Sequence, residues 1–128
     1  MENDLEIIRT ASTKFMALMK EHFDITLAYN KESLIWVDKY IKALANSDVD
    51  PKSRAESLWI IGAWFGELLV HSFKGRWIFD EQWEQWTVKM EAEEPFTAYP
   101  FSKVLNQVKK GQEESISVLY NNLLLKGF

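Results

Sequence analysis

The sequence has no cysteine, and it has only two histidines, three prolines and five glycines among its 128 residues. The absence of cysteine excludes disulfides, thiol catalysis and cysteine-ligated metal sites. It fits a reducing compartment, and we expect a cytoplasmic location. The segment Met1 to Glu6 is acidic and lacks an apolar stretch. We therefore expect no signal peptide.

The chain also lacks a long apolar run and a basic block. Its longest apolar run, Leu58 to Val70, is shorter than the about 20 residues that span a bilayer. The formal charge is -4, with acidic and basic residues interspersed. Nucleic-acid binding requires clustered lysine and arginine. We accordingly expect neither a membrane nor a nucleic acid as partner.

The common catalytic patterns are missing as well. No G-x-S-x-G, phosphate-binding loop, G-x-G-x-x-G or H-E-x-x-H is present. We expect no cofactor, no metal and no catalytic residue, although an enzyme with an unrecognised site stays open as an alternative. What is plentiful is tryptophan, with six residues. A core filled by large rings is the favoured interpretation, and a ligand pocket is the alternative.

Hydrophobic spacing predicts one domain over residues 1–128, with an α+β fold in which helices dominate. We expect five helices and a small antiparallel β meander between the third and fourth. The helices span about 3–23, 31–45, 51–74, 100–110 and 113–125, and the strands 76–79, 85–90 and 96–99. Residues 24–30 are expected to be extended. Asp38 is expected on the solvent side of its helix, and Gly75 is expected to end the third helix.

Glu67 is the one charged residue within the central apolar run. A buried carboxylate without a partner would cost several kcal/mol. His71 lies four residues further on, and Arg76 and Arg54 are other candidate partners. A structural tie is the favoured interpretation. A ligand pocket around Glu67 and His71, lined by neighbouring tryptophans, is the alternative.

Gly62 and Gly66 form a G-x-x-x-G pattern inside the predicted helix. Each glycine costs about 1 kcal/mol of helix propensity relative to alanine. We expect these glycines to let a helix or a tryptophan ring approach the backbone closely. The candidate pocket or structural-tie residues are Glu67, His71, Arg76, Trp77 and Trp64.

Three stretches resemble a family of small bacterial proteins of unknown function. Residues 29–41 are similar to Y-x-x-E-S-L-x-W-V-D-x-Y-I, residues 61–77 to L-G-A-x-x-G-E followed by G-G-x-W, and residues 100–115 to P-F-S-K-V followed by G-x-E-x-S. Ile61 replaces the leucine, and Lys74 replaces the first paired glycine. The resemblance implies no activity. It implies that Gly62, Gly66, Glu67, Trp77 and the turn at 100–102 form one neighbourhood.

The expected function is a non-catalytic protein-binding or adaptor domain of the bacterial cytoplasm. Its most concrete version is an immunity-type protein, by analogy with other small bacterial domains. Such a role requires a surface patch, for example around Trp83 and the acidic residues 91–94. The sequence gives no oligomeric state.

Overall fold

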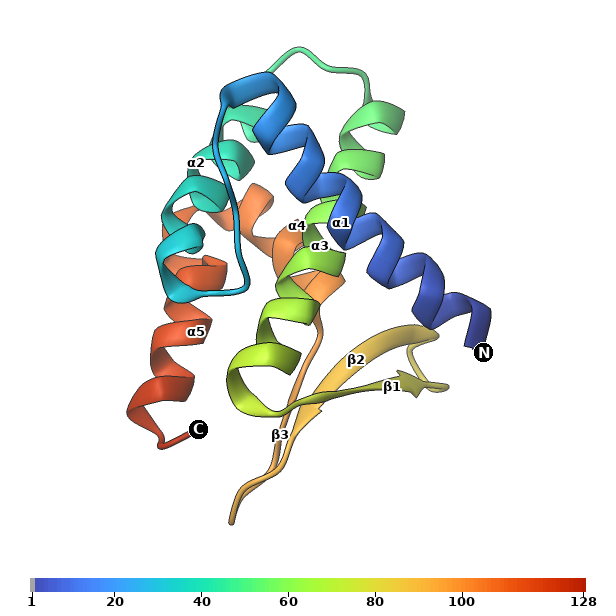
Figure 1. Ribbon diagram of the computed structural model, residues 1–128, viewed down its shortest axis with the longest axis vertical. Helices are drawn as coiled ribbons and strands as arrows, with labels where there is room; N and C mark the ends of the chain where they lie inside the picture. Colours follow the sequence, from blue (N-terminus) through green and yellow to red (C-terminus); the bar gives the residue numbers. More distant parts are fainter. Residues whose placement is uncertain (1) are drawn as a thin grey trace.

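The computed structural model describes residues 2–128, with side chains from Asn3 onward (Figure 1). Short 3-10 turns, Lys31–Ser33 and Gln112–Glu114, precede the second and fifth α-helices. The α-helices and strands are α1 (Glu2–Phe23), α2 (Leu34–Ala45), α3 (Pro51–Phe73), β1 (Arg76–Asp80), β2 (Gln85–Met90), β3 (Phe96–Ala98), α4 (Pro100–Lys110) and α5 (Ile116–Leu125). The expected fold class is confirmed, including the position of the meander between the third and fourth helices.

The strands form one antiparallel sheet in the order β1-β2-β3, with Trp77 opposite Val88 and Met90 opposite Phe96. Val88 and Met90 alternate along β2, and both are buried in the main core. This is the period of two that a sheet with one covered face requires. The sheet follows the C-terminal end of α3, and β3 leads directly into α4 (Figure 1).

Helix α3 runs through the middle of the molecule, with α1 crossing in front of it and α4 behind it (Figure 1). Every residue from Ile61 to Leu69 is buried. Trp64, Phe65, Leu68 and Leu69 are among the largest fully buried side chains. The expectation that the central apolar run is a core helix is therefore confirmed. The first two turns of α3 are mostly exposed, as their polar sequence indicates.

Local interactions determine where α3 begins and ends. Asp50 Oδ1 accepts a hydrogen bond of 3.0 Å from the Ser53 backbone N–H, and Pro51 occupies the first turn. At the other end the left-handed residue is Lys74, with φ 53°, so the helix ends one residue before the expected glycine. Glycine is needed at position 75 for a steric reason, because a Cβ there would lie 2.6 Å from Val88 Cγ1.

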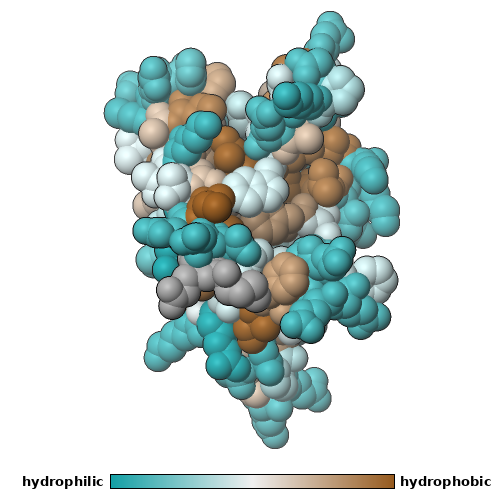
Figure 2. All heavy atoms as spheres, turned by 90° about the vertical axis from the view of Figure 1, so that its right-hand side faces the viewer, coloured by the Kyte–Doolittle hydropathy of each residue, from teal (hydrophilic) through white to brown (hydrophobic). Residues whose placement is uncertain are grey.

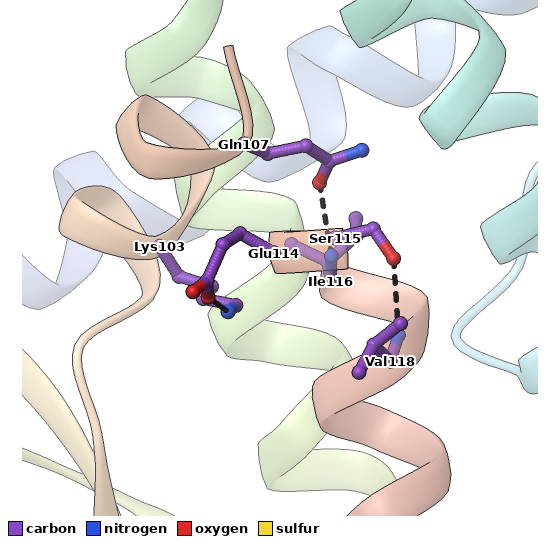
Figure 3. A network of polar contacts seen from close by, with 6 residues as sticks. All are labelled: Lys103, Gln107, Glu114, Ser115, Ile116 and Val118. Carbon is purple, nitrogen blue, oxygen red and sulfur yellow. Dashed lines mark hydrogen bonds and ion pairs between the residues drawn. The ribbon is translucent and has the colours of Figure 1, made fainter. Parts of the chain in front are cut away.

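Two connections differ from the expected elements. Residues 24–30 form an irregular segment without strand pairing in the described chain, although Leu27 is buried in the core. A short apolar alternation is not sufficient for a strand when no neighbouring strand is available. The last helix begins later than expected, because the Ser115 hydroxyl accepts from the Val118 N–H at 3.1 Å and caps α5 (Figure 3).

Candidate functional site

An aromatic pair lies on the surface where α3 meets the start of α4. The rings of Trp59 and Phe101 stack with centroids 5.2 Å apart and an interplanar angle of 18°. Gly62 makes this possible, because a Cβ there would lie 2.6 Å from Phe101 Cδ1. Trp59 nevertheless remains 40% exposed. The stack thus presents a fixed aromatic face to solvent.

Exposed apolar side chains also occur on α4 and α1. Leu105 follows Phe101 by one turn of α4 and is 45% exposed. Ile7 on α1 is also exposed, while Ile60 and Phe101 pack on the small buried cluster of Ile8, Ala11 and Ala63. Figure 2 shows hydrophobic atoms gathered in a hollow on the side of the molecule that carries α1 and the first half of α3. We call Trp59, Phe101 and Leu105 the Trp59 surface.

Glu67 is tied to the sheet through Trp77. The Trp77 indole Nε1 donates to Glu67 Oε2 at 2.9 Å, and Glu67 is only 7% exposed. The same indole covers Gly66, where a Cβ would lie 1.9 Å from Trp77 Cη2. Trp77 also lies 6.1 Å from the Phe101 ring. The neighbourhood expected around Gly62, Gly66, Glu67 and Trp77 is therefore present, with Phe101 in its centre.

The expected partners of Glu67 make other contacts. His71 stacks on Tyr29 with centroids 4.5 Å apart and an interplanar angle of 13°. Arg76 lies 3.7 Å from a Glu91 oxygen. The Arg54 guanidinium donates to the Ser47 carbonyl at 2.8 Å. An indole N–H donates to Glu67 instead, and sequence spacing alone could not indicate a donor on a strand.

Tyr29 extends this neighbourhood towards α1. Its hydroxyl shares a hydrogen bond of 2.7 Å with the buried Ser12 hydroxyl. Burial raises the pKa of Tyr29; the Ser12 bond lowers that pKa, and the nearby charge of Glu67 raises it further. Trp64 lies deeper, fully buried beside Phe15, and its indole N–H has no hydrogen-bond partner among the described residues. It therefore belongs to the core.

A second buried carboxyl group contradicts the expectation for α2. Asp38 is 8% exposed and does not face solvent. The Gln107 side-chain amide donates to Asp38 Oδ1 at 2.8 Å, and the Ser117 hydroxyl donates to Oδ2. Gln107 in turn accepts from the Ile116 N–H at 2.9 Å (Figure 3). The signal was available, since residue 38 lies four after buried Leu34 and three before buried Ile41.

A groove separates the C-terminal turns of α2 and α4. Its volume is about 370 Å³. Three of its residues are lysines, and none is acidic. The lining residues are Ile41, Lys42, Ala45, Asn46, Gln107, Val108, Lys109, Lys110, Gly111 and Gln112. We call it the lysine groove; sequence analysis had identified none of its residues as a site.

The residues of the surface patch expected around Trp83 and residues 91–94 lie apart from one another. Trp83 is exposed in the turn between β1 and β2, whereas residues 91–94 follow the other end of β2. Six residues of strand separate the two, a span of about 20 Å. The Trp59 surface, by contrast, combines apolar side chains of two helices, α3 and α4.

Comparison with protein-family models, with curated proteins and with solved structures finds no match for this chain. The resemblance to a bacterial family thus stays a prediction. Within residues 2–128, no helix is long and apolar enough to cross a membrane. Among the side chains that the structure describes, Asn3 onward, no three acidic or histidine residues converge as a metal ion would require.

Proposed function

We propose that this chain is a protein-binding domain and that the Trp59 surface is its contact site. The observation that carries the proposal is the stacked pair of Trp59 and Phe101, which is ordered and yet 40% exposed at the tryptophan. Tryptophan is enriched among the few residues that dominate binding energy at protein interfaces. Exposed apolar patches on soluble proteins commonly mark such interfaces.

The rigidity of this surface supports the proposal. Phe101 rests on the Gly62 backbone, so the ring beneath Trp59 has little freedom to move. A side chain ordered before binding loses less conformational entropy on association. Other exposed tryptophans differ: Trp36 lies beneath the Lys39 amine, and Trp83 lies in a β-turn. The Trp59 surface is therefore better prepared for a partner than these positions.

The most specific form of the proposal is an immunity-type protein of the bacterial cytoplasm, which binds and blocks a toxin domain. Small size and a formal charge of -4 fit this class. The family resemblance of residues 29–41 and 100–115 also supports a bacterial origin. This form rests on a class-level analogy, whereas the contact surface rests on the geometry of Trp59 and Phe101.

Site-specific photo-crosslinking in bacterial cells expressing the chain tests the contact surface. A photoreactive amino acid replaces Leu105, and in a control it replaces Leu125, which is 86% exposed on α5. We expect one discrete adduct from position 105 that disappears when Trp59→Ala is added. The same adducts from both positions, or adducts that persist with Trp59→Ala, would contradict the proposal.

A second candidate function, small-ligand binding, is favoured by one observation. The hydrogen bond from Trp77 uses one oxygen of Glu67, which leaves the other oxygen able to accept. Tyr29 and His71 stack nearby. A thermal-shift screen with metal ions and metabolites would then raise Tm for the parent chain but not for Glu67→Gln. An unchanged Tm across a broad panel would count against this function.

A further inference from the structure

The lysine groove is lined by basic residues, whereas the chain as a whole is acidic. The whole sequence has 19 acidic and 15 basic residues. The groove has Lys42, Lys109 and Lys110 and no acidic residue in its lining. The negative ends of the α2 and α4 dipoles offset roughly half a charge each. The groove therefore keeps a net positive charge within an acidic protein.

The lysine amines of the groove are not neutralised by ion pairs. The ion pairs among the side chains of residues 3–128 use Lys20, Arg76, Lys89 and Lys103 as cations. Glu114 follows the groove residue Gln112 by two positions, and it pairs with Lys103 at 2.9 Å (Figure 3). Lys103 holds the pKa of Glu114 below its ordinary value, and Lys110 contributes less. An anion entering the groove would thus meet three lysines, none of which forms an ion pair with a described side chain.

The base of the groove is apolar and firmly held. Ile41 is buried in the main core, and the partly buried Val108 packs against that core. Gln107, beside them, is fixed by its bonds to Asp38 and to the Ile116 N–H. A rigid apolar base with charged groups at its edge suits an apolar side chain flanked by anionic groups. A volume of about 370 Å³ is sufficient for a short segment.

The groove is also close to the proposed contact surface along α4. Leu105 belongs to the Trp59 surface, and Lys109 follows it by one helical turn. A partner lying across α4 would therefore meet apolar side chains first and lysines next. This arrangement connects the two features into one extended face.

The geometry points to the lysine groove as the site that receives an acidic segment of the protein partner, with glutamate or aspartate carboxylates bound by Lys42, Lys109 and Lys110. The inference rests on the proposed protein-binding function and names the chemistry of the partner. A nucleic acid is less suited to the groove. Its lining contains no aromatic side chain for base stacking.

Fluorescence anisotropy with a synthetic peptide tests this inference directly. The probe is a fluorescein-labelled, glutamate-rich peptide with two leucines, and the control peptide has glutamine for glutamate. We compare the parent chain with a triple variant, Lys42→Gln, Lys109→Gln and Lys110→Gln. A matched triple variant, Lys14→Gln, Lys31→Gln and Lys52→Gln, removes the same charge from exposed positions elsewhere.

We expect the acidic peptide to bind the parent chain and the matched variant alike, and the groove variant at least tenfold more weakly. Binding should weaken between about 0.01 M and about 1 M ionic strength, as the Debye length falls from about 30 to about 3 Å. Equal losses in the two variants, equal binding of the glutamine peptide, or no binding would overturn the inference. Tighter binding of a single-stranded DNA oligonucleotide of equal charge would overturn it too.

The two proposals fail in different ways. If crosslinking at Leu105 gives no specific adduct, the Trp59 surface is not a contact site, whatever the peptide shows. If that adduct forms and the groove variant forms it as efficiently as the matched variant, the protein-binding function stands. In that case the lysine groove has no part in it.

Discussion

Asp38 and Glu67 are two buried carboxyl groups, and the chain satisfies them differently. Asp38 accepts from Gln107 and Ser117 and so joins α2, α4 and α5. Glu67 accepts from Trp77 and joins α3 to β1. Asp38 is therefore satisfied at both oxygens by distant helices, and Glu67 at one oxygen by the neighbouring strand. The comparison indicates a structural role for Asp38 and leaves part of Glu67 available for binding.

The largest effect is expected for Asp38→Ala. This change leaves the amide of Gln107 and the hydroxyl of Ser117 without their acceptor in a buried place, at a cost of about 3–4 kcal/mol. Asp38→Asn should also destabilise, by roughly 2 kcal/mol, because its amide N–H₂ cannot accept. Urea unfolding with constant m-values measures both losses.

Exposed Asp48→Ala is the control for Asp38→Ala, with an expected change below about 0.5 kcal/mol. A double-mutant cycle of Asp38→Ala with Ser117→Ala should give a coupling of roughly 0.5–3 kcal/mol. Additive losses would show that the carboxyl group of Asp38 does not tie α5 to α2.

Gly66→Ala is expected to have the next largest effect. The new Cβ would lie 1.9 Å from the Trp77 ring, so the indole must move away from its position beside Glu67. Overpacking of this kind costs about 1–3 kcal/mol. Thermal unfolding measures the loss, and Gly111→Ala serves as a comparison because a Cβ there meets no atom within 4 Å. Gly111 has φ 82°, so its substitution reports backbone strain without a clash.

A Gly66→Ala variant as stable as the parent would mean that Trp77 can tilt without loss. The ring would then not fix the donor to Glu67, and the difference between the two carboxyl groups would have another origin.

Glu67→Leu tests the weaker tie, and we expect a loss of about 1–2 kcal/mol because the Trp77 N–H loses its acceptor. Glu67→Gln keeps an acceptor oxygen and should change the free energy of unfolding by less than about 1 kcal/mol. The denaturant midpoints of the two variants measure this difference. Large losses in both, equal to those at Asp38, would make Glu67 a structural tie and remove the case for ligand binding.

The sequence predicted the helices and strands because each element has its own hydrophobic period. It could not predict the side-chain hydrogen bonds that join one element to another. Gln107 is 69 residues from Asp38, and their contact depends on how α2 and α4 pack. For Glu67 the sequence indicated that a partner was required, and Gly66 indicated a close approach by a helix or a tryptophan ring. The structure shows that Trp77 on β1 both donates the hydrogen bond to Glu67 and packs on Gly66. The sequence could not predict this, because it depends on where β1 lies.

Exposure was the other quantity that the sequence did not determine. Trp59 belongs to the apolar run Leu58–Val70, which predicted a buried helix, and most of that run is buried. At position 59 the neighbouring element is the start of α4, and Phe101 covers one face of the indole. With this cover the indole stays 40% exposed.

The smallest effect concerns a half-buried carboxyl group, Asp80, which extends the comparison towards the surface. The Tyr99 hydroxyl donates to Asp80 Oδ2 at 2.8 Å, and the Trp83 N–H donates to Oδ1. The Tyr99 bond, and to a lesser degree the Trp83 bond, hold the pKa of Asp80 below its ordinary value. The same bond to Asp80 raises the pKa of Tyr99, with burial adding to it.

The sign of each pKa shift gives the pH window. Asp80 stabilises the fold above the ordinary aspartate pKa of about 3.9, and this contribution is lost as pH falls through the lower folded pKa. Tyr99 stabilises the fold below the ordinary tyrosine pKa of about 10, and this contribution is lost as pH rises through the higher folded pKa. The stability difference between the parent and Tyr99→Phe should therefore be largest from about pH 5 to about pH 9.

Thermal unfolding across pH measures this difference, with Tyr120→Phe as the matched control. The Tyr120 hydroxyl bonds to the Ser72 hydroxyl at 3.1 Å, and serine does not titrate in this range. The control should therefore show no decline at acid pH, whereas the difference for Tyr99→Phe should shrink there. Parallel acid profiles would mean that solvent competes fully for Asp80, so that a carboxyl group needs the burial seen at Asp38 before its hydrogen bonds contribute to stability.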